Sequence, residues 1–362
     1  MNIYEGDCVM KRTARKILYG LMLCCLYVFL FTGSLSHYSY AEAPKIIRLA
    51  TLAPEGTTWL KVFHDIDEEL QSKSNGGLRL KIYAGGVAGD EDSYIRKMRI
   101  SQIHCAAFTS LGLSTILPAA RILDLPFFYK NYEEVDLIKN SLNDIFANSF
   151  EEKGYVLLGW SELGFVYFFS KDEVNSISDL RSTKMWLWQG DRMVGSLFDH
   201  LGMSPIPLSL PHVTGSLQSG LVNAVYGPPI GVIALNWFKD VKYMLNLPLA
   251  NASGAVLITK KYYNSLPPDL QEILKGTFKK HTARLTQLTR EDNERSIEVM
   301  HEYGIKLTTA NDDIVKEFDR CSEETREWLS GRLFPNALLE NVTAEIEKHR
   351  KRILVKLKVV KN

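Results

Sequence analysis

The chain has 362 residues, of which 46% are hydrophobic and 23% charged, so it has ample apolar material for packed cores. Its length favours about two domains. The formal net charge of +1 at pH 7 excludes a broad electrostatic attraction to nucleic acid, and no nucleic-acid partner is expected.

The first 41 residues have the pattern of a signal peptide. Four basic residues at positions 11–16 precede an apolar run over residues 17–31, which is short for the ~30 Å hydrocarbon core of a membrane. Ser39-Tyr40-Ala41 then supplies a small-x-small cleavage site, with Ala43 at the end of a rival site. We expect cleavage near Ala41 and an exported, soluble mature protein; the alternative is a retained membrane anchor.

The number of cysteines limits the disulfide bonds that the protein can form. Only Cys105 and Cys321 of the five cysteines lie beyond the predicted signal peptide, which excludes a disulfide scaffold. A single bridge between the two and a pair of free thiols are both open, since Cys105 lies in an apolar run that favours a buried thiol.

The chain after the signal peptide begins with alternating strands and helices. Residues 45–51 are apolar enough for a buried strand, and residues 78–82 alternate between apolar and basic side chains. Between them, apolar residues recur on one helical face: Trp59, Phe63, Ile66 and Leu70. A second helix through Met98 and a third strand over residues 103–108 complete an order that favours an α/β sheet with helices on its faces.

A long strand in the middle of the chain is predicted to cross between two lobes. Residues 155–169 exceed the usual ~5–6 residues of a strand and contain Gly159 and Gly164. Leu123 to Tyr129 is read as a buried turn, and residues 132–150 as one helix. We expect hinges near residues 159–164 and 249–254.

The second half continues the alternation. Strands are expected at 184–188, 204–208, 224–226, 244–249 and 255–260, and helices at 193–201, 212–219 and 230–238. A helix from Ser265 to Gly304 would reach on the order of 50 Å at ~1.5 Å per residue, enough to lie across two lobes. Seven basic residues over positions 348–362 predict a frayed tail, with a membrane-surface contact as the less favoured alternative.

No motif of a common active site is present. The chain lacks a phosphate-binding loop of the Walker type, His-Glu-x-x-His, Cys-x-x-Cys and Gly-x-Ser-x-Gly, and its eight histidines are scattered. We therefore expect no metal, no cofactor and no enzymatic activity, although a catalytic triad assembled from distant segments is left open.

Between residues 45 and 350 the chain resembles the solute-binding subunits of tripartite ATP-independent periplasmic (TRAP) transporters of the DctP type. The resemblance lies in six stretches in the same order and spacing: residues 51–56, 83–90, 123–128, 178–185, 217–224 and 265–274. It implies two α/β lobes with mixed sheets flanked by helices, hinge strands and a long helix across both lobes.

The same resemblance implies a biological role. The protein would capture a small organic ligand in an interlobe cleft and deliver it to the membrane subunits of a TRAP-type permease, which would be its only membrane contact. The expected organisation is a signal peptide over 1–41, lobe 1 over 42–160 and lobe 2 over 161–250. Residues 251–345 would return to lobe 1 with long closing helices, and 346–362 would form the basic tail.

Three departures from the family pattern concern the ligand. Trp186 stands where relatives that bind carboxylic acids carry an arginine, and Val166 stands where some relatives carry a second one. Tyr226 and Gly227 replace a glutamate and an asparagine. Since a charged hydrogen bond contributes roughly 1.5–3 kcal/mol, these changes predict a ligand less charged or more apolar than a C4-dicarboxylate.

Ten residues are predicted to contact the ligand. Most fall at strand ends or first helical turns, where ligands bind at the edge of an open α/β sheet. They are Trp59, Glu91, Phe108, Thr109, Val166, Trp186, Gln189, Leu210, Tyr226 and Gly227. Each has a structural alternative: the aromatic residues could be core, Glu91 a solvated acid at a helix start and Thr109 a cap. In a strand Trp186 and Trp188 share one face, and we expect that face to line the cleft.

Two other functions fit the same sequence. A periplasmic ligand-sensing or scaffolding protein could use this fold without transport, and neighbouring genes for a sensor kinase rather than for permease subunits would indicate it. A hydrolase or lyase on the fold is the weaker alternative.

Overall fold

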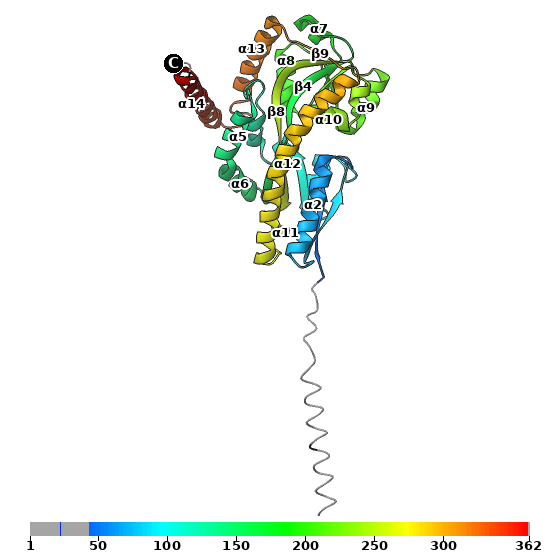
Figure 1. The fold of residues 1–362 in the computed structure, drawn as a ribbon, viewed down its shortest axis with the longest axis vertical. Helices are drawn as coiled ribbons and strands as arrows, with labels where there is room; N and C mark the ends of the chain where they lie inside the picture. The colour runs from blue at the N-terminus through cyan, green and yellow to red at the C-terminus, as the bar shows by residue number, and fades with distance from the viewer. Residues whose placement is uncertain (1–21, 23–42, 361–362) are drawn as a thin grey trace, which may run out of the picture. The chain divides into compact units, whose positions relative to one another are not determined.

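The computed structural model describes Met22 and residues 43–360, with side chains through residue 355 (Figure 1). The chain divides into two units, residues 1–43 and residues 44–362, and the second unit holds all the strands and helices named below. The predicted signal peptide lies outside the described residues except for Met22. Within the described part of the chain, none of the helices combines the length and the hydropathy that a membrane span requires.

The first lobe is built on three parallel strands in the order β2-β1-β3. The elements are β1 (Lys45–Ala50), α2 (Thr58–Lys73), β2 (Leu78–Tyr83), α3 (Glu91–Arg99) and β3 (Cys105–Thr109). Both helices begin at capping residues, because the Thr57 side chain accepts from Leu60 N and Asp90 accepts from Ser93 N. Clusters of buried apolar side chains cover the two faces of this sheet.

Short helices follow β3 and lead to the crossing strand. They are α4 (Ser110–Ile116), the 3₁₀ helix η1 (Pro118–Asp124), α5 (Tyr132–Ser141) and α6 (Asn143–Glu152). The single helix predicted over residues 132–150 is therefore two helices that meet at Leu142. The predicted buried turn from Leu123 to Tyr129 is confirmed, since all its apolar side chains are buried.

Two long antiparallel strands run through both lobes. β4 (Tyr155–Ser170) pairs with β8 (Tyr243–Thr259), and the register shifts next to Gly159, next to Gly164 and again after Val166. The two strands predicted at 244–249 and 255–260 are thus one strand. β8 also pairs with β3, so the parallel strands of the first lobe join the same mixed sheet.

The second lobe extends this sheet. Its elements are α7 (Ile177–Ser182), β5 (Trp186–Trp188), α8 (Arg192–His200), β6 (Ile206–Leu208), α9 (Leu210–Ser219), β7 (Ala224–Gly227), α10 (Pro229–Ala234) and η2 (Trp237–Lys239). β7 pairs with β4, β5 pairs with β6, and a bridge between Met185 and Ala224 links the two sheets. A third cluster of buried apolar residues forms its core.

The long helix predicted over residues 265–304 is confirmed. The short α11 (Lys260–Tyr263) precedes α12 (Pro268–Glu302), which packs along β4 and contacts α2 in one lobe and α10 in the other (Figure 1). Gly159 and Gly164 permit this packing. A Cβ at Gly159 would lie 2.1 Å from Thr282 Oγ1, and one at Gly164 would lie 2.4 Å from Asn293 Nδ2.

The last part of the chain departs from the expected organisation. β9 (Lys306–Thr308) pairs with β8, and α13 (Asp312–Leu329) packs into the core of the second lobe. The expected return of residues 251–345 to lobe 1 is therefore wrong for these two elements. The end of α13 at Leu329, Phe334 and α14 (Asn336–Val360) do pack on the first lobe, α14 through side chains such as Val342.

The expected frayed tail is also wrong. α14 continues through Val360, and Arg350 binds both carboxylate oxygens of Glu134 at 2.7 Å. The basic segment thus has a specific partner on α5. Cys105 and Cys321 are buried free thiols, which decides between the two alternatives left open by the sequence.

Candidate functional site

A cavity of about 220 Å³ lies among residues of both lobes. Nine of the ten predicted ligand contacts are in its wall: Trp59, Glu91, Phe108, Thr109, Val166, Trp186, Leu210, Tyr226 and Gly227. Gln189 is exposed and is not part of the wall, because its strand has ended and the chain turns toward Gly190. The structure thus brings together residues that are up to 168 positions apart, from Trp59 to Gly227; their contact with a ligand stays a prediction.

Aromatic side chains form one part of the wall. The Trp186 ring stacks on Tyr226 with centroids 5.1 Å apart, and Trp188 and Trp237 lie 5.7 Å and 5.3 Å from it. Trp186 and Trp188 both line the cavity while Met185 and Leu187 do not, so the predicted orientation of this strand is confirmed.

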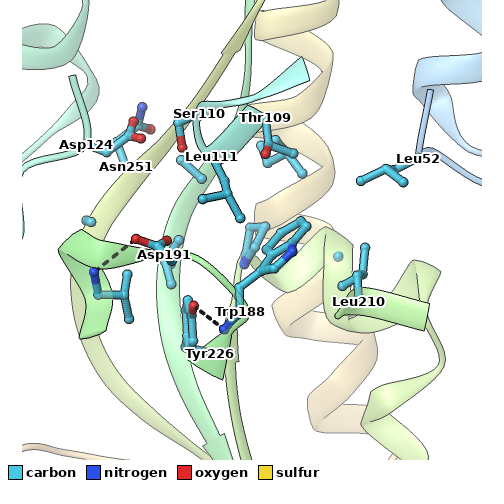
Figure 2. Close-up of a pocket in the computed structure, with 18 of the residues that line it drawn as sticks. Leu52, Thr109, Ser110, Leu111, Asp124, Trp188, Asp191, Leu210, Tyr226 and Asn251 are labelled. Carbon is cyan, nitrogen blue, oxygen red and sulfur yellow. Dashed lines mark hydrogen bonds between the residues drawn. The ribbon is translucent and has the colours of Figure 1, made fainter. Parts of the chain in front are cut away.

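The polar atoms of these rings already have partners. Trp186 Nε1 donates to Leu208 O at 3.0 Å, and the Tyr226 hydroxyl accepts from Trp188 N at 3.1 Å (Figure 2). Burial raises the pKa of Tyr226 well above its usual value, so the phenol stays neutral. Trp186 and Tyr226 therefore supply flat apolar area more than free polar groups.

Both carboxylate oxygens of Glu91 accept hydrogen bonds from Thr109. Its Oε1 accepts from Thr109 N at 2.5 Å and its Oε2 from Thr109 Oγ1 at 2.8 Å. Burial raises the pKa of Glu91 to about 7, against the effect of these two hydrogen bonds. The pair fixes the start of α3 against the end of β3, and near neutral pH this carboxyl is partly protonated.

A buried ion pair in the cavity wall has no counterpart among the residues predicted from the sequence. Arg121, from η1, places its Nη2 3.0 Å and 3.1 Å from the two carboxylate oxygens of Asp191, the residue that caps α8. Arg121 is 4% exposed and Asp191 is 7% exposed. Because η1 belongs to the first lobe and α8 to the second, this pair joins the lobes across the cavity.

Two more polar residues complete this cluster. Arg121 Nη1 donates to Ser110 Oγ at 3.2 Å, and Arg121 Nε lies 3.8 Å from Asp124 Oδ2. Burial acts to lower the pKa of Arg121, and the carboxylates of Asp191 and Asp124 outweigh it, so the net shift is upward. Burial raises the pKa of Asp124 to about 6, against the opposing charge of Arg121.

The cavity wall therefore does contain a fixed positive charge, on Arg121. Arg121 is the one basic residue in the cavity wall among the described residues, but its charge is already matched by Asp191. The available signal was a pair of charges three positions apart, Arg121 and Asp124, inside the otherwise apolar run of residues 116–128. Such charges are buried only with partners.

The arrangement fits binding better than catalysis. The wall combines a large apolar and aromatic surface with a few polar groups at one side, as small-molecule sites do. Within the described residues, no group of three or more His, Cys, Asp or Glu side chains could hold a metal ion.

Two lobes joined by crossing strands, with a mainly apolar cavity between them, define a bilobal ligand-binding protein. Residues 49–330 match the family described as bacterial extracellular solute-binding protein, family 7, known as DctP. The match spans more than half of the chain, so the chain belongs to this family, and the resemblance to the TRAP solute-binding subunits is confirmed.

Known relatives match most of the chain at low sequence identity. The chain is 24% identical over 251 residues to the 2,3-diketo-L-gulonate-binding periplasmic protein YiaO of Escherichia coli (strain K12), covering 69% of this chain and 75% of YiaO. It is 20% identical over 267 residues to the C4-dicarboxylate-binding periplasmic protein DctP of Rhodobacter capsulatus, covering 72% and 79%. Both relatives are named as binding proteins rather than as enzymes.

A solved structure agrees on the fold. The sugar acid binding protein DctPAm from Advenella mimigardefordensis strain DPN7T, in complex with galactonate, superposes with a TM-score of 0.79 at 18% identity. The alignment covers 84% of this chain and 98% of DctPAm. The predicted two-lobed α/β fold is thereby confirmed.

Proposed function

We propose that the mature chain is a periplasmic receptor that captures a small organic ligand and delivers it to the membrane subunits of a TRAP-type importer. The observation that carries this proposal is the cavity shared by the two lobes of a family 7 solute-binding protein. The nine predicted residues in the cavity wall are the proposed ligand contacts, and Gln189 is left out because it is exposed.

The proposed ligand is less charged or more apolar than a C4-dicarboxylate. YiaO, DctP and DctPAm are named for acids. By the resemblance given above, Trp186 stands where acid-binding relatives carry an arginine. The one arginine in the described cavity wall, Arg121, is engaged by Asp191. At roughly 25 cal/mol per Å², covering about 100 Å² of a ligand with Trp186 and Tyr226 would contribute about 2.5 kcal/mol. That gain is comparable with the ion pair that the substitution removes.

Ligand capture is proposed to close the lobes about the crossing strands. Residues 161–164 of the first predicted hinge segment (159–164) pair with residues 252–254 of the second (249–254), and the register of β4 and β8 shifts beside Gly159 and Gly164. Interrupted strand pairing leaves fewer regular hydrogen bonds to resist bending.

Mass spectrometry and calorimetry test the proposed function. Native mass spectrometry of protein purified from the periplasm should show a co-purified ligand and a mature chain that begins near Glu42. After the ligand is stripped, calorimetry should give weaker binding of succinate and malate than of apolar or aromatic acids and amides. Trp186→Phe keeps an aromatic side chain at this position but replaces the indole by a smaller ring. Micromolar binding of a C4-dicarboxylate that this change leaves untouched would contradict the proposed ligand class.

A further inference from the structure

The polar side of the cavity contains buried atoms without hydrogen-bond partners. Among the described residues, nothing hydrogen-bonds to Asp124 Oδ2 or Asn251 Oδ1; Arg121 Nε, also without a hydrogen bond, faces Asp124 Oδ2 at 3.8 Å. All three side chains line the cavity, and none is more than 4% exposed. Buried polar groups are almost always satisfied, so a cluster of unsatisfied ones at a binding cavity requires an explanation.

Other polar atoms of Asp124, Asn251 and Asp191 already have hydrogen-bond partners. Asp124 Oδ1 accepts from Ser253 N at 2.9 Å, and the Asn251 amide nitrogen donates to Ser253 Oγ at 3.2 Å. Asp191 Oδ1 accepts from Met193 N and from Val194 N at the start of α8, both at 3.1 Å. These two hydrogen bonds from the first turn of α8 fix the Asp191 carboxylate opposite Arg121.

The balance of charge at this side favours a cation. Arg121 faces two carboxylates, and Asp191 takes both bonds from its Nη2, so the Asp124 carboxylate is in excess when it is ionised. A ligand carboxylate placed here would meet the two acidic side chains, with the nearest cation already engaged. An ammonium group has three donors and no acceptor, which suits two unsatisfied acceptor oxygens.

The wall changes character across the cavity. Figure 2 shows Asp124, Asn251 and Asp191 toward one side and Trp188 and Leu210 toward the other. A ligand that satisfies both sides has a polar nitrogen at one end and an apolar or aromatic body at the other.

We infer that the cavity selects an amine: an aromatic or apolar ligand whose ammonium group binds at Asp124 Oδ2 and Asn251 Oδ1. This inference rests on the proposed function, since it names the ligand class of the same cavity. It goes further than the absence of an acid clamp, because it assigns a site for a positively charged group.

Three compounds of one shape and different head groups test the inference. Calorimetry of ligand-stripped protein should rank 2-phenylethylamine above 2-phenylethanol and phenylacetate, with at least about a tenfold preference for the amine, as a hydrogen bond to a charged group implies. Equal affinities for amine and alcohol would indicate that a buried water satisfies these oxygens, and would overturn the inference. Tighter binding of phenylacetate, or no binding of the amine at millimolar concentration, would also overturn it.

Two substitutions test whether Asp124 causes the preference for the amine over the alcohol. Asp124→Asn keeps an oxygen that can accept from Ser253 N but removes the charge, and it should reduce the preference for amine over alcohol by about tenfold. Asp199→Asn removes one carboxylate from an exposed position of α8 and should leave the preference unchanged. An unchanged preference in folded Asp124→Asn overturns the inference. Failure of the proposed function is recognised separately, by periplasmic protein that carries no co-purified ligand.

Discussion

Replacing Asp191 by asparagine tests the ion pair that joins the lobes. Asparagine keeps an oxygen to accept from Met193 N and Val194 N, so the cap of α8 is preserved while the charge opposite Arg121 is lost. Both partners of the pair are nearly fully buried, and removing one partner of such a pair typically costs about 3–5 kcal/mol. We take the lower end, about 3 kcal/mol, because Asp124 remains 3.8 Å from Arg121 Nε and partly compensates its charge.

This loss should appear mainly as a change in the distance between the lobes. Since the pair forms only when the lobes are together, about 3 kcal/mol would shift the equilibrium toward a more open form by roughly 100-fold. Small-angle scattering of ligand-free Asp191→Asn should give a larger radius of gyration than that of the parent protein. Asp191→Ala should open equally but lose about 1 kcal/mol more stability, because the helix cap is also removed. Scattering curves that superpose for all three proteins would show that the pair does not hold the lobes.

Three further predictions concern stability. The Glu91 carboxyl has an ordinary pKa of 4.5 and a pKa of about 7 in the fold, so the folded protein binds more protons between these values. The stability should therefore fall as the pH rises from 4.5 to about 7, and Glu91→Gln should flatten this slope in thermal melts. Arg290→Leu leaves Glu162, which is 1% exposed, without the guanidinium that binds both its oxygens. It should cost about 3 kcal/mol in urea unfolding, and a loss under about 1 kcal/mol would contradict the role of this pair. Gly159→Ala places a Cβ against α12 and should destabilise by about 1–3 kcal/mol, whereas Gly276→Ala, which meets open space, should not.

The sequence predicted most elements of the fold because their apolar patterns agree with their final environment. The four apolar residues on one face of α2 are all buried. The long helix was predicted from Ser265 to Gly304, and α12 extends from Pro268 to Glu302. One exception is β8, which was predicted as two strands over residues 244–249 and 255–260 but is a single strand that contains Pro248. The structure tolerates this proline because β4 and β8 skip residues between Ala250 and Leu245, so no regular ladder bond is required there.

The apolar side of the cavity was also predictable, but the polar side was not. Trp186 and Tyr226 could be assigned from their places in the family pattern, and both line the cavity. The pairing of Arg121 with Asp191 joins residues 70 positions apart, and no local pattern encodes which acid a buried arginine meets. Gln189 lies outside the cavity wall because the strand ends at Trp188.

Gly159 and Gly164 show a second limit of prediction from a single sequence. Their presence in a strand was read correctly as an irregularity, but the physical cause is a helix that approaches from elsewhere in the sequence. Thr282 and Asn293 of α12 occupy the space that a side chain would need. A single sequence shows that a glycine is present but not which neighbour requires it.

The pairing of β3 with β8 sets a condition on the order in which the protein folds. Cys105 pairs with Ile258 and Thr109 with Gly254, so the sheet of the first lobe is closed on one side by residues from a much later part of the sequence. A chain folded only as far as α6 would present β3 as an open strand edge of apolar residues, which is prone to pair with other chains. Completion of the first lobe must therefore await the arrival of β8, and contacts between such distant segments make folding slow.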